Sequence, residues 1–299
     1  MNTARPAKPS NPLSSADPPL YVAGPAGRLA VSAFPAEGAV RGVVVAGHAM
    51  MCDRRTLDRP RGAGLATSLS RAGLHTYTFD ARGHGESDPG SFDYAAVLED
   101  LAAVVAWAHA RHPGLPLAIL GHSLMGHGAL LWLAQAPPGG AAVRAVVAVA
   151  GNLWLPRLEP SRLRWLRKRA VLWVMLALTR ACGRFPARAL RLGSADVSRP
   201  FVEDFARWAA SGVCQRPDGG DALAGLAQVR VPVLAVLGGQ DRLLCHPACG
   251  RRFAALVPRS EVLEVPGADH IGLCTSPRSA PAWAEVAEWL VAHLSEVRA

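Results

Sequence analysis

Short runs of residues with strand character alternate along the chain with longer stretches in which apolar residues recur every three or four positions. Most of the short runs are apolar on both faces, which is typical of strands buried inside a parallel sheet. Such strands are expected at residues 42–47, 74–79, 117–120, 145–150, 231–237 and 262–265. Two further short strands are expected between residues 20 and 34, around a Gly-Pro-Ala-Gly turn.

The stretches between these runs have helical spacing. One helix is expected to contain Val97, Leu101, Val104 and Ala108, with Asp93 as its N-cap. Others are expected around 57–69, after residue 123 and at 283–294. Regular alternation of strand and helix predicts an α/β fold, with a doubly wound, mostly parallel sheet and right-handed crossovers.

One region interrupts this alternation. Residues 152–220 are rich in Trp and Arg and contain no run typical of a buried strand. We therefore assign residues 20–151 and 221–299 to the core of the fold and treat 152–220 as a helical insertion. Trp165, Trp173 and Met175 are expected to share one apolar helix face.

Composition and charge bear on whether the protein binds a metal, is secreted or spans a membrane. The chain has 299 residues, half of them apolar, and a net charge of +9 that comes almost wholly from Arg. The six cysteines show no zinc-ligand spacing, so we expect reduced thiols in a cytoplasmic protein without metal or cofactor. Residues 1–19 lack the apolar segment of a secretory signal and are expected to be a disordered leader. The longest apolar run, 170–178, is too short to span a bilayer.

A serine lies between an expected strand and an expected helix, in the segment Gly121-His122-Ser123-Leu124-Met125-Gly126. A serine on such a sharp turn is typical of the G-x-S-x-G nucleophile elbow, although Met125 stands where the pattern has glycine. Taken alone, the segment fits a helix N-cap serine equally well. If it is an elbow, Met125 must face a small residue, for which we expect an alanine of 145–150.

An acid and a histidine follow two later strands. Asp241 comes just after the strand at 231–237, and His270 just after the strand at 262–265. Residues at the carboxyl ends of parallel strands converge on one crevice, and the order Ser, Asp, His is that of a known catalytic triad. Asp269 is the alternative acid and His246 the alternative base.

Three loops together resemble those of the serine α/β-hydrolase superfamily. They are Asp80-Ala81-Arg82-Gly83-His84-Gly85-Glu86-Ser87, Gly238-Gly239-Gln240-Asp241 and Gly267-Ala268-Asp269-His270. The resemblance runs from about residue 20 to the end and is greatest to the esterase, lipase and monoacylglycerol-lipase-like group. It implies that Ser123 is the nucleophile, His270 the base and Asp241 the residue that orients the base.

The same resemblance implies the surroundings of the serine. The oxyanion hole would use the N–H of Leu124 and one from Ala49 or Met50. We expect His48, Met125 and Trp173 to contact the substrate, and the insertion to form a cap over Ser123. Between residues 161 and 192 nine basic residues and no acid occur. They fit either a solvated face or contact with an anionic membrane surface, and no nucleic acid is expected.

These features favour a serine hydrolase that cleaves a carboxylic ester with a hydrophobic acyl group through an acyl-enzyme. A thioesterase or an acyltransferase with the same triad is the alternative within the class. A non-catalytic scaffold that binds a ligand without turnover is the alternative outside it. Epoxide hydrolases and dehalogenases of this fold carry Asp at the elbow, where this chain has Ser123.

Overall fold

An eight-stranded sheet forms the centre of the molecule in the computed structural model, which describes residues 18–216 and 218–295. Its spatial strand order is β1-β2-β4-β3-β5-β6-β9-β10. The strands are β1 (Leu20–Gly24), β2 (Gly27–Phe34), β3 (Gly42–Gly47), β4 (Leu74–Phe79), β5 (Leu117–His122), β6 (Val143–Val149), β9 (Val233–Gly238) and β10 (Ser260–Val265). From β4 to β10 in this order neighbours run parallel, and β1 and β2 add an antiparallel edge. The predicted α/β fold with a mostly parallel sheet is confirmed.

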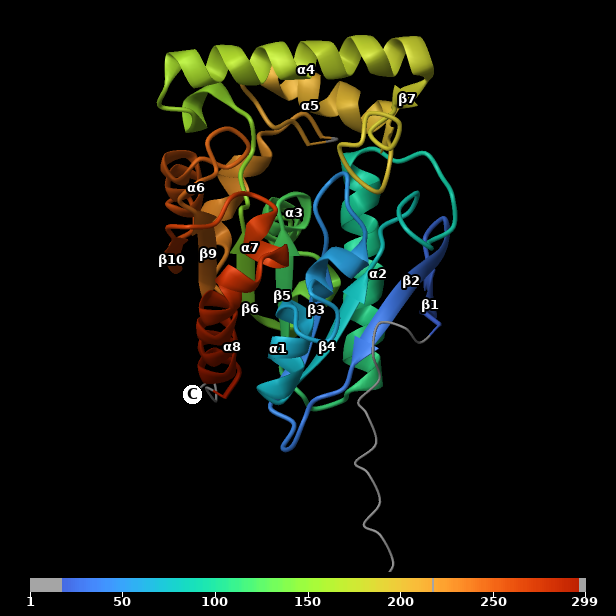
Figure 1. The fold of residues 1–299 in the computed structure, drawn as a ribbon, viewed down its shortest axis with the longest axis vertical. Coiled ribbons are helices and arrows are strands. Elements are labelled where there is room, and N and C mark those ends of the chain that lie inside the picture. Colours follow the sequence, from blue (N-terminus) through green and yellow to red (C-terminus); the bar gives the residue numbers. More distant parts are fainter. Residues whose placement is uncertain (1–17, 217, 296–299) are drawn as a thin grey trace, which may run out of the picture.

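Helices cover both faces of this sheet (Figure 1). The longer helices are α1 (Leu65–Arg71), α2 (Tyr94–Arg111), α3 (Leu124–Leu133), α4 (Arg162–Cys182), α5 (Arg199–Ser211), α6 (Pro247–Ala254) and α8 (Ala280–Ser295). The short ones are η1 (Arg54–Asp58), η2 (Pro138–Ala142), η3 (Pro156–Leu158), η4 (Ala222–Gln228), α7 (Gly272–Thr275) and η5 (Pro277–Ser279). The expected N-cap of α2 is confirmed, because Asp93 accepts a hydrogen bond of 2.8 Å from the N–H of Ala96.

Two apolar cores result from the alternation of side chains along the strands. Val43 and Val45 of β3 point to the core under α2 and α3, whereas Val44 and Ala46 point to the core under α1 and α8. All six residues of β3 are buried, as expected for a central parallel strand. This double burial explains why the apolar runs in the sequence predict the strands closely.

The insertion is mainly helical, with α4, α5 and the short strands β7 (Arg184–Phe185) and β8 (Val197–Ser198). Figure 1 shows α4 lying across one end of the molecule with α5 beside it. Ser161 caps the start of α4, and Gly183 ends it in the left-handed conformation, with φ of 76°. We call residues 152–220 the cap, and the boundaries of this division stay a prediction.

The expected apolar face of α4 is wrong. Its buried residues are Lys168, Leu172, Met175 and Thr179, whereas Trp173 is 74% exposed. Trp173 and Met175 are two positions apart, which places them about 200° apart around a helix, so they cannot share a face. Apolar residues lie on both the inner and the outer sides of α4.

Two further expectations concern the ends of the chain and the membrane. The leader predicted for residues 1–19 lies, apart from its last two residues, outside the part that the structure describes. Among the helices within 18–216 and 218–295, none has the length and apolar character needed to cross a bilayer.

Candidate active site

Ser123 stands on a strained turn between β5 and α3. Its φ of 51° and ψ of −103° are unusual for a non-glycine residue, and such strain is typical of a nucleophile elbow. The N–H of Ser123 donates a hydrogen bond of 2.7 Å to the carbonyl of Val149, which fixes the turn to the end of β6. A Cβ at position 121 would overlap the backbone of Met125, so the turn requires Gly121. The local geometry therefore matches an elbow more closely than an ordinary helix N-cap, and Ser123 makes no side-chain cap hydrogen bond.

The residue that makes room for Met125 differs from the one expected. Met125 is fully buried, and its side chain occupies the space beside the Cα of Gly47, at the end of the neighbouring strand β3. A small residue therefore faces Met125 as expected, but it is Gly47 of β3 and not an alanine of 145–150. Gly126, the next residue, approaches the carbonyl of Val149, which ends β6, and the Cα of Gly151 just after it.

Asp241 and His270 form a buried pair. The Nδ1 of His270 lies 2.6 Å from Oδ2 of Asp241, and the N–H groups of Cys245 and Leu243 donate to the same carboxylate at 2.8 and 3.3 Å. Burial opposes ionisation of Asp241, but the His270 ring and these N–H groups outweigh it and lower its pKa. The carboxylate is thus ionised and held in place to orient the imidazole.

The two alternative residues have other partners. Asp269 accepts a hydrogen bond of 2.7 Å from the N–H of Gly272, and His246 caps α6 by accepting from the N–H of Ala248 at 3.2 Å. Ser123 and His270 line the same cavity. Within the described chain no hydrogen bond joins their side chains, a gap that is common before substrate binds.

His122 supports the loop that carries His270. Its Nε2 lies 2.9 Å from the carbonyl oxygen of His270, and burial lowers the pKa of His122 to about 3. The neutral ring therefore donates from Nε2 to this carbonyl. Its Nδ1 has no hydrogen-bond partner among the residues that the structure describes.

The expected oxyanion donors lie around the same cavity. Leu124 is the first residue of α3, so its N–H has no partner within the helix. Leu124, Ala49 and Met50 line the cavity together with Ser123. The carbonyls of Ala49 and Met50 are bound elsewhere, since they accept from Nδ1 of His48 at 2.8 Å and from Nε2 of His84 at 2.8 Å.

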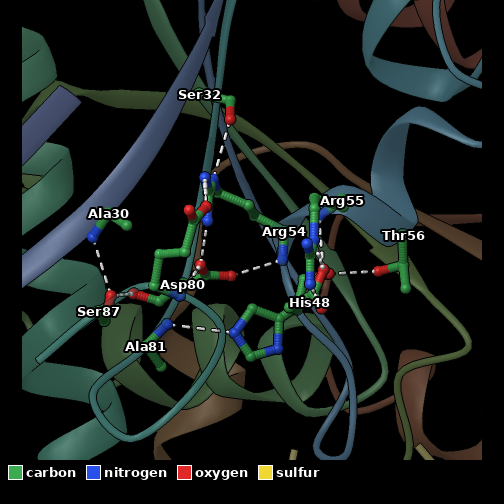
Figure 2. A network of polar contacts seen from close by, with 11 residues as sticks. Ala30, Ser32, His48, Arg54, Arg55, Thr56, Asp80, Ala81 and Ser87 are labelled. Atoms are coloured by element: carbon green, nitrogen blue, oxygen red, sulfur yellow. Dashed lines mark hydrogen bonds and ion pairs between the residues drawn. The ribbon is translucent and has the colours of Figure 1, made fainter. Parts of the chain in front are cut away.

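His48 holds this loop through its two ring nitrogens. It is fully buried, does not line the cavity, and its Nε2 accepts from the N–H of Ala81 at 3.1 Å (Figure 2). Burial lowers the pKa of His48 to about 3, so the neutral ring donates from Nδ1 to the Ala49 carbonyl. The structure thus places His48 behind the cavity wall and not at its surface, and its expected contact with substrate stays a prediction.

A buried ion pair ties η1, which follows β3, to the end of β4. The guanidinium of Arg54 contacts the carboxylates of Asp80 and Glu86 and donates to Ser32 at 2.9 Å, while the Arg54 N–H donates to Asp80 at 2.6 Å (Figure 2). Ser87 donates to the Asp80 carbonyl at 2.6 Å. Sequence reasoning missed Arg54. The available signal was Asp80 itself, because a carboxylate at the end of a buried strand needs a cationic partner.

The cavity above Ser123 has a volume of ≈ 210 Å³ and is mainly apolar. Leu172 and Met175 of α4 and Phe201, Val202 and Phe205 of α5 line it, so the cap contributes much of its wall. Trp173 and Met125 do not line it, the first because it is exposed on the outer side of α4 and the second because it is buried below the elbow. The structure does not bring either residue to the cavity surface, and their expected contacts with substrate stay predictions.

Asn152 is one of the few polar residues at this cavity and sequence reasoning missed it. It is 6% exposed, and its Nδ2 points to the carbonyl of Leu244 at 3.5 Å. Its Oδ1 is buried and has no partner in the described chain. A buried acceptor without a partner costs about 1–3 kcal/mol.

The chain is similar to proteins of known activity. It is 28% identical over 273 residues to the monoacylglycerol lipase of Mycolicibacterium smegmatis, and the match covers 85% of this chain and 89% of that protein. The structure resembles a soluble variant of the Saccharomyces cerevisiae monoglyceride lipase, with a TM-score of 0.71, 19% identity and 98% and 100% of the two chains covered. It also resembles the Paleococcus ferrophilus monoacylglycerol lipase, with a TM-score of 0.61, 20% identity and 89% and 99% coverage.

The structural likenesses show the fold, because their sequence identities are low. The family is shown by the sequence itself, since residues 41–271 match the model of a single hydrolase family. That range contains Ser123, Asp241 and His270. The chain belongs to the family described as serine aminopeptidase, S33, and is an α/β-hydrolase of the esterase and lipase type.

Proposed function

We propose that this protein hydrolyses carboxylic esters with an apolar acyl chain through a triad of Ser123, His270 and Asp241. The observation that carries the proposal is the buried Asp241–His270 pair at 2.6 Å, which opens on the same cavity as the serine of the strained elbow. A nucleophile, a base and a residue that orients the base are the elements that acyl transfer requires.

The mechanism follows from these positions. The Oγ of Ser123 attacks the ester carbonyl and its proton passes to Nε2 of His270, while Asp241 stabilises the resulting imidazolium. The N–H of Leu124 and that of Ala49 or Met50 bind the oxyanion. The C–O bond to the alcohol then breaks, His270 protonates the alcohol, and water attacks the acyl-enzyme by the same route.

Two features of the cavity support the substrate class. Its apolar wall, formed largely by α4 and α5, suits an acyl chain. Asn152, one of the few polar residues of the lining, suits an alcohol that carries a free hydroxyl. A monoacylglycerol has both features, and the M. smegmatis relative is named a monoacylglycerol lipase.

The test is hydrolysis of p-nitrophenyl esters from acetate to laurate, together with the monoacylglycerol and the methyl ester of one fatty acid. The proposal expects kcat/KM to rise from acetate to medium chains and to be higher for the monoacylglycerol than for the methyl ester. Preference for acetate would contradict the apolar acyl site. Turnover of acyl thioesters only, or transfer to added alcohol without free acid, would identify the alternative chemistries.

We also infer that the outer side of α4 binds an anionic membrane surface. Leu163, Leu166, Trp173 and Val174 are between 58% and 74% exposed and fall on one stripe of the helix, opposite its buried side. The spacing places exposed arginines at both edges of this stripe: Arg162, Arg169 and Arg180 along one edge and Arg167 along the other. An apolar stripe with cationic edges is typical of a helix that lies in the lipid interface.

The state of the cysteines indicates the kind of cellular compartment in which the protein works. All six cysteines are unpaired, and five of them are buried. Because extracellular proteins tend to form disulfides, we infer a reducing location such as the cytoplasm.

A further inference from the structure

Two cavities lie on opposite sides of one hydrogen-bonded pair. His127 lines the cavity above Ser123, and Tyr94 lines a second cavity of ≈ 570 Å³ between α2, α3 and α5. The Oη of Tyr94 and Nδ1 of His127 are 2.7 Å apart, and both residues are buried. This pair is therefore part of the wall between the two cavities.

Aromatic rings extend the wall on the cap side. The ring centroid of Phe205 lies 6.0 Å from that of Tyr94 and 6.0 Å from that of His127, and the ring of Phe201 stacks on Tyr94 at 5.9 Å. Phe201 and Phe205 face the catalytic cavity, whereas Trp208, 4.9 Å from Tyr94, faces the second cavity. A layer one to two rings thick separates the two spaces.

The wall is close to the reacting serine. His127 follows Ser123 by four residues, and its N–H donates to the Ser123 carbonyl at 3.1 Å, so it lies one helical turn further along the same side of α3. A chain attached to Ser123 that runs toward α5 meets His127 and Phe205.

The wall also suits an apolar chain, because it carries no charge. Burial lowers the pKa of His127 to about 3 and raises the pKa of the Tyr94 hydroxyl. Both rings are therefore neutral at physiological pH, and the Tyr94 hydroxyl and the Nδ1 of His127 are hydrogen-bonded to each other.

We propose that the Tyr94–His127 pair and Phe205 form an end wall that sets the longest acyl chain this enzyme accepts. The proposal rests on the proposed ester hydrolysis. A chain that reaches the wall gains no further contact, and a longer one must fold back or displace a ring. Without the Tyr94 ring the chain would enter the second cavity, where Leu98, Leu131 and Trp132 offer apolar surface. Each methylene buried there would raise kcat/KM by about fourfold.

The test is kcat/KM for p-nitrophenyl esters with acyl chains of increasing length, measured on wild type and four variants. In wild type we expect kcat/KM to rise with length and then to fall at one chain length. Tyr94→Ala moves this limit to longer chains, and so does Phe205→Ala, which opens the wall from the cap side in case the first variant does not fold. Tyr94→Phe keeps the ring and the limit. Trp132→Ala changes the second cavity behind an intact wall and also keeps the limit.

Two results would overturn the end wall. One is an unchanged limit in folded Tyr94→Ala and Phe205→Ala, with melting temperatures near that of wild type and intact fluorophosphonate labelling. The other is a limit that moves equally in Trp132→Ala. Failure of the proposed function is a separate outcome, because wild type would then hydrolyse none of the esters.

Discussion

Met125 fills the space that a side chain at Gly47 would need, so that the residue after the elbow packs directly on the neighbouring strand β3. The two residues are 78 positions apart, but Gly47 is paired with Gly121 in the sheet and Met125 is the second residue of the helix that follows β5. The large side chain of Met125 beside the elbow is thus accommodated by the absence of a side chain at Gly47 on β3.

This contact predicts a coupled effect on stability. Gly47→Ala forces its Cβ into Met125 and should lower the free energy of unfolding by about 1–3 kcal/mol, as overpacking does. Met125→Ala leaves a cavity and should cost about 2–5 kcal/mol. In the double variant the overlap is gone, so its loss should be smaller than the sum of the two. Urea unfolding of all four proteins measures this, and strict additivity would show that the two side chains do not compete for space.

The proposed role of Asp241 can be tested against Asp269, the carboxylate that precedes His270 in the sequence. Asp241→Asn removes the charge that fixes the His270 tautomer and should lower kcat by about 10⁴-fold. Asp269→Asn is the matched control, because Asp269 contacts the N–H of Gly272 instead. It should retain kcat within a few-fold. Steady-state hydrolysis of one ester compares the two, and a larger loss in Asp269→Asn would mean that the acid is misassigned.

The buried histidines predict loss of stability in acid. Burial lowers the pKa of His48, His122 and His127 to about 3 each, whereas an imidazole in an unfolded chain has a pKa of about 6.5. Between these values the unfolded state binds protons that the folded state does not. The free energy of unfolding should therefore fall as pH falls from about 6.5 to 3, by up to roughly 4 kcal/mol per pH unit for the three groups.

Urea unfolding across this pH range measures the slope. His122→Asn should reduce it by about 1.4 kcal/mol per pH unit, because one proton fewer is taken up on unfolding. His109→Gln, at an exposed position of α2, serves as the control and should leave it unchanged. A slope that is the same in His122→Asn as in wild type would mean that His122 is not buried in its neutral form.

The proposed contact of the outer side of α4 with an anionic membrane can be tested with variants of its exposed apolar residues. Trp173→Ser and Leu166→Ser each remove a large exposed apolar side chain and should weaken binding to phosphatidylserine-containing vesicles by roughly tenfold or more. Added salt should weaken wild-type binding, because the arginines at the edges of the stripe are screened.

Vesicle co-sedimentation gives both results. Val262→Ser, at an exposed site on β10 far along the chain from α4, is the matched control and should bind as wild type does. Binding by Trp173→Ser and Leu166→Ser that equals wild-type binding would show that the stripe does not contact lipid. Wild-type binding that does not change with salt would show that the arginines at its edges do not contribute.

Local patterns in the sequence predict the core of this protein well. Strands buried on both faces produce apolar runs, and Asp241 lies shortly after such a run in β9. His270 lies shortly after β10, an edge strand whose residues are not fully buried but whose short apolar pattern still marks it. Packing between segments that are far apart in the sequence is harder to predict from local patterns. Gly47 lies beside Met125 because β3 and β5 are neighbours in the sheet. Arg54 contacts Asp80 because η1 packs against the end of β4.

The cap shows a different limit. In α4 apolar residues occupy both sides of the helix, so Leu166 and Trp173 face outward while Leu172 and Met175 face the cavity. Periodicity identifies one apolar face only where the opposite face is polar. The inward side of such a helix becomes evident only when the structure shows what it packs against.

Fluorophosphonate labelling with mass-spectrometric mapping of the modified peptide tests most directly whether Ser123 is an activated nucleophile. We expect a single covalent adduct on Ser123 in wild type, slower labelling in Asp241→Asn, and no adduct in Ser123→Ala, whose melting temperature should stay near that of wild type. An adduct of equal yield in Ser123→Ala, or a folded wild-type protein that the probe never modifies, would contradict it.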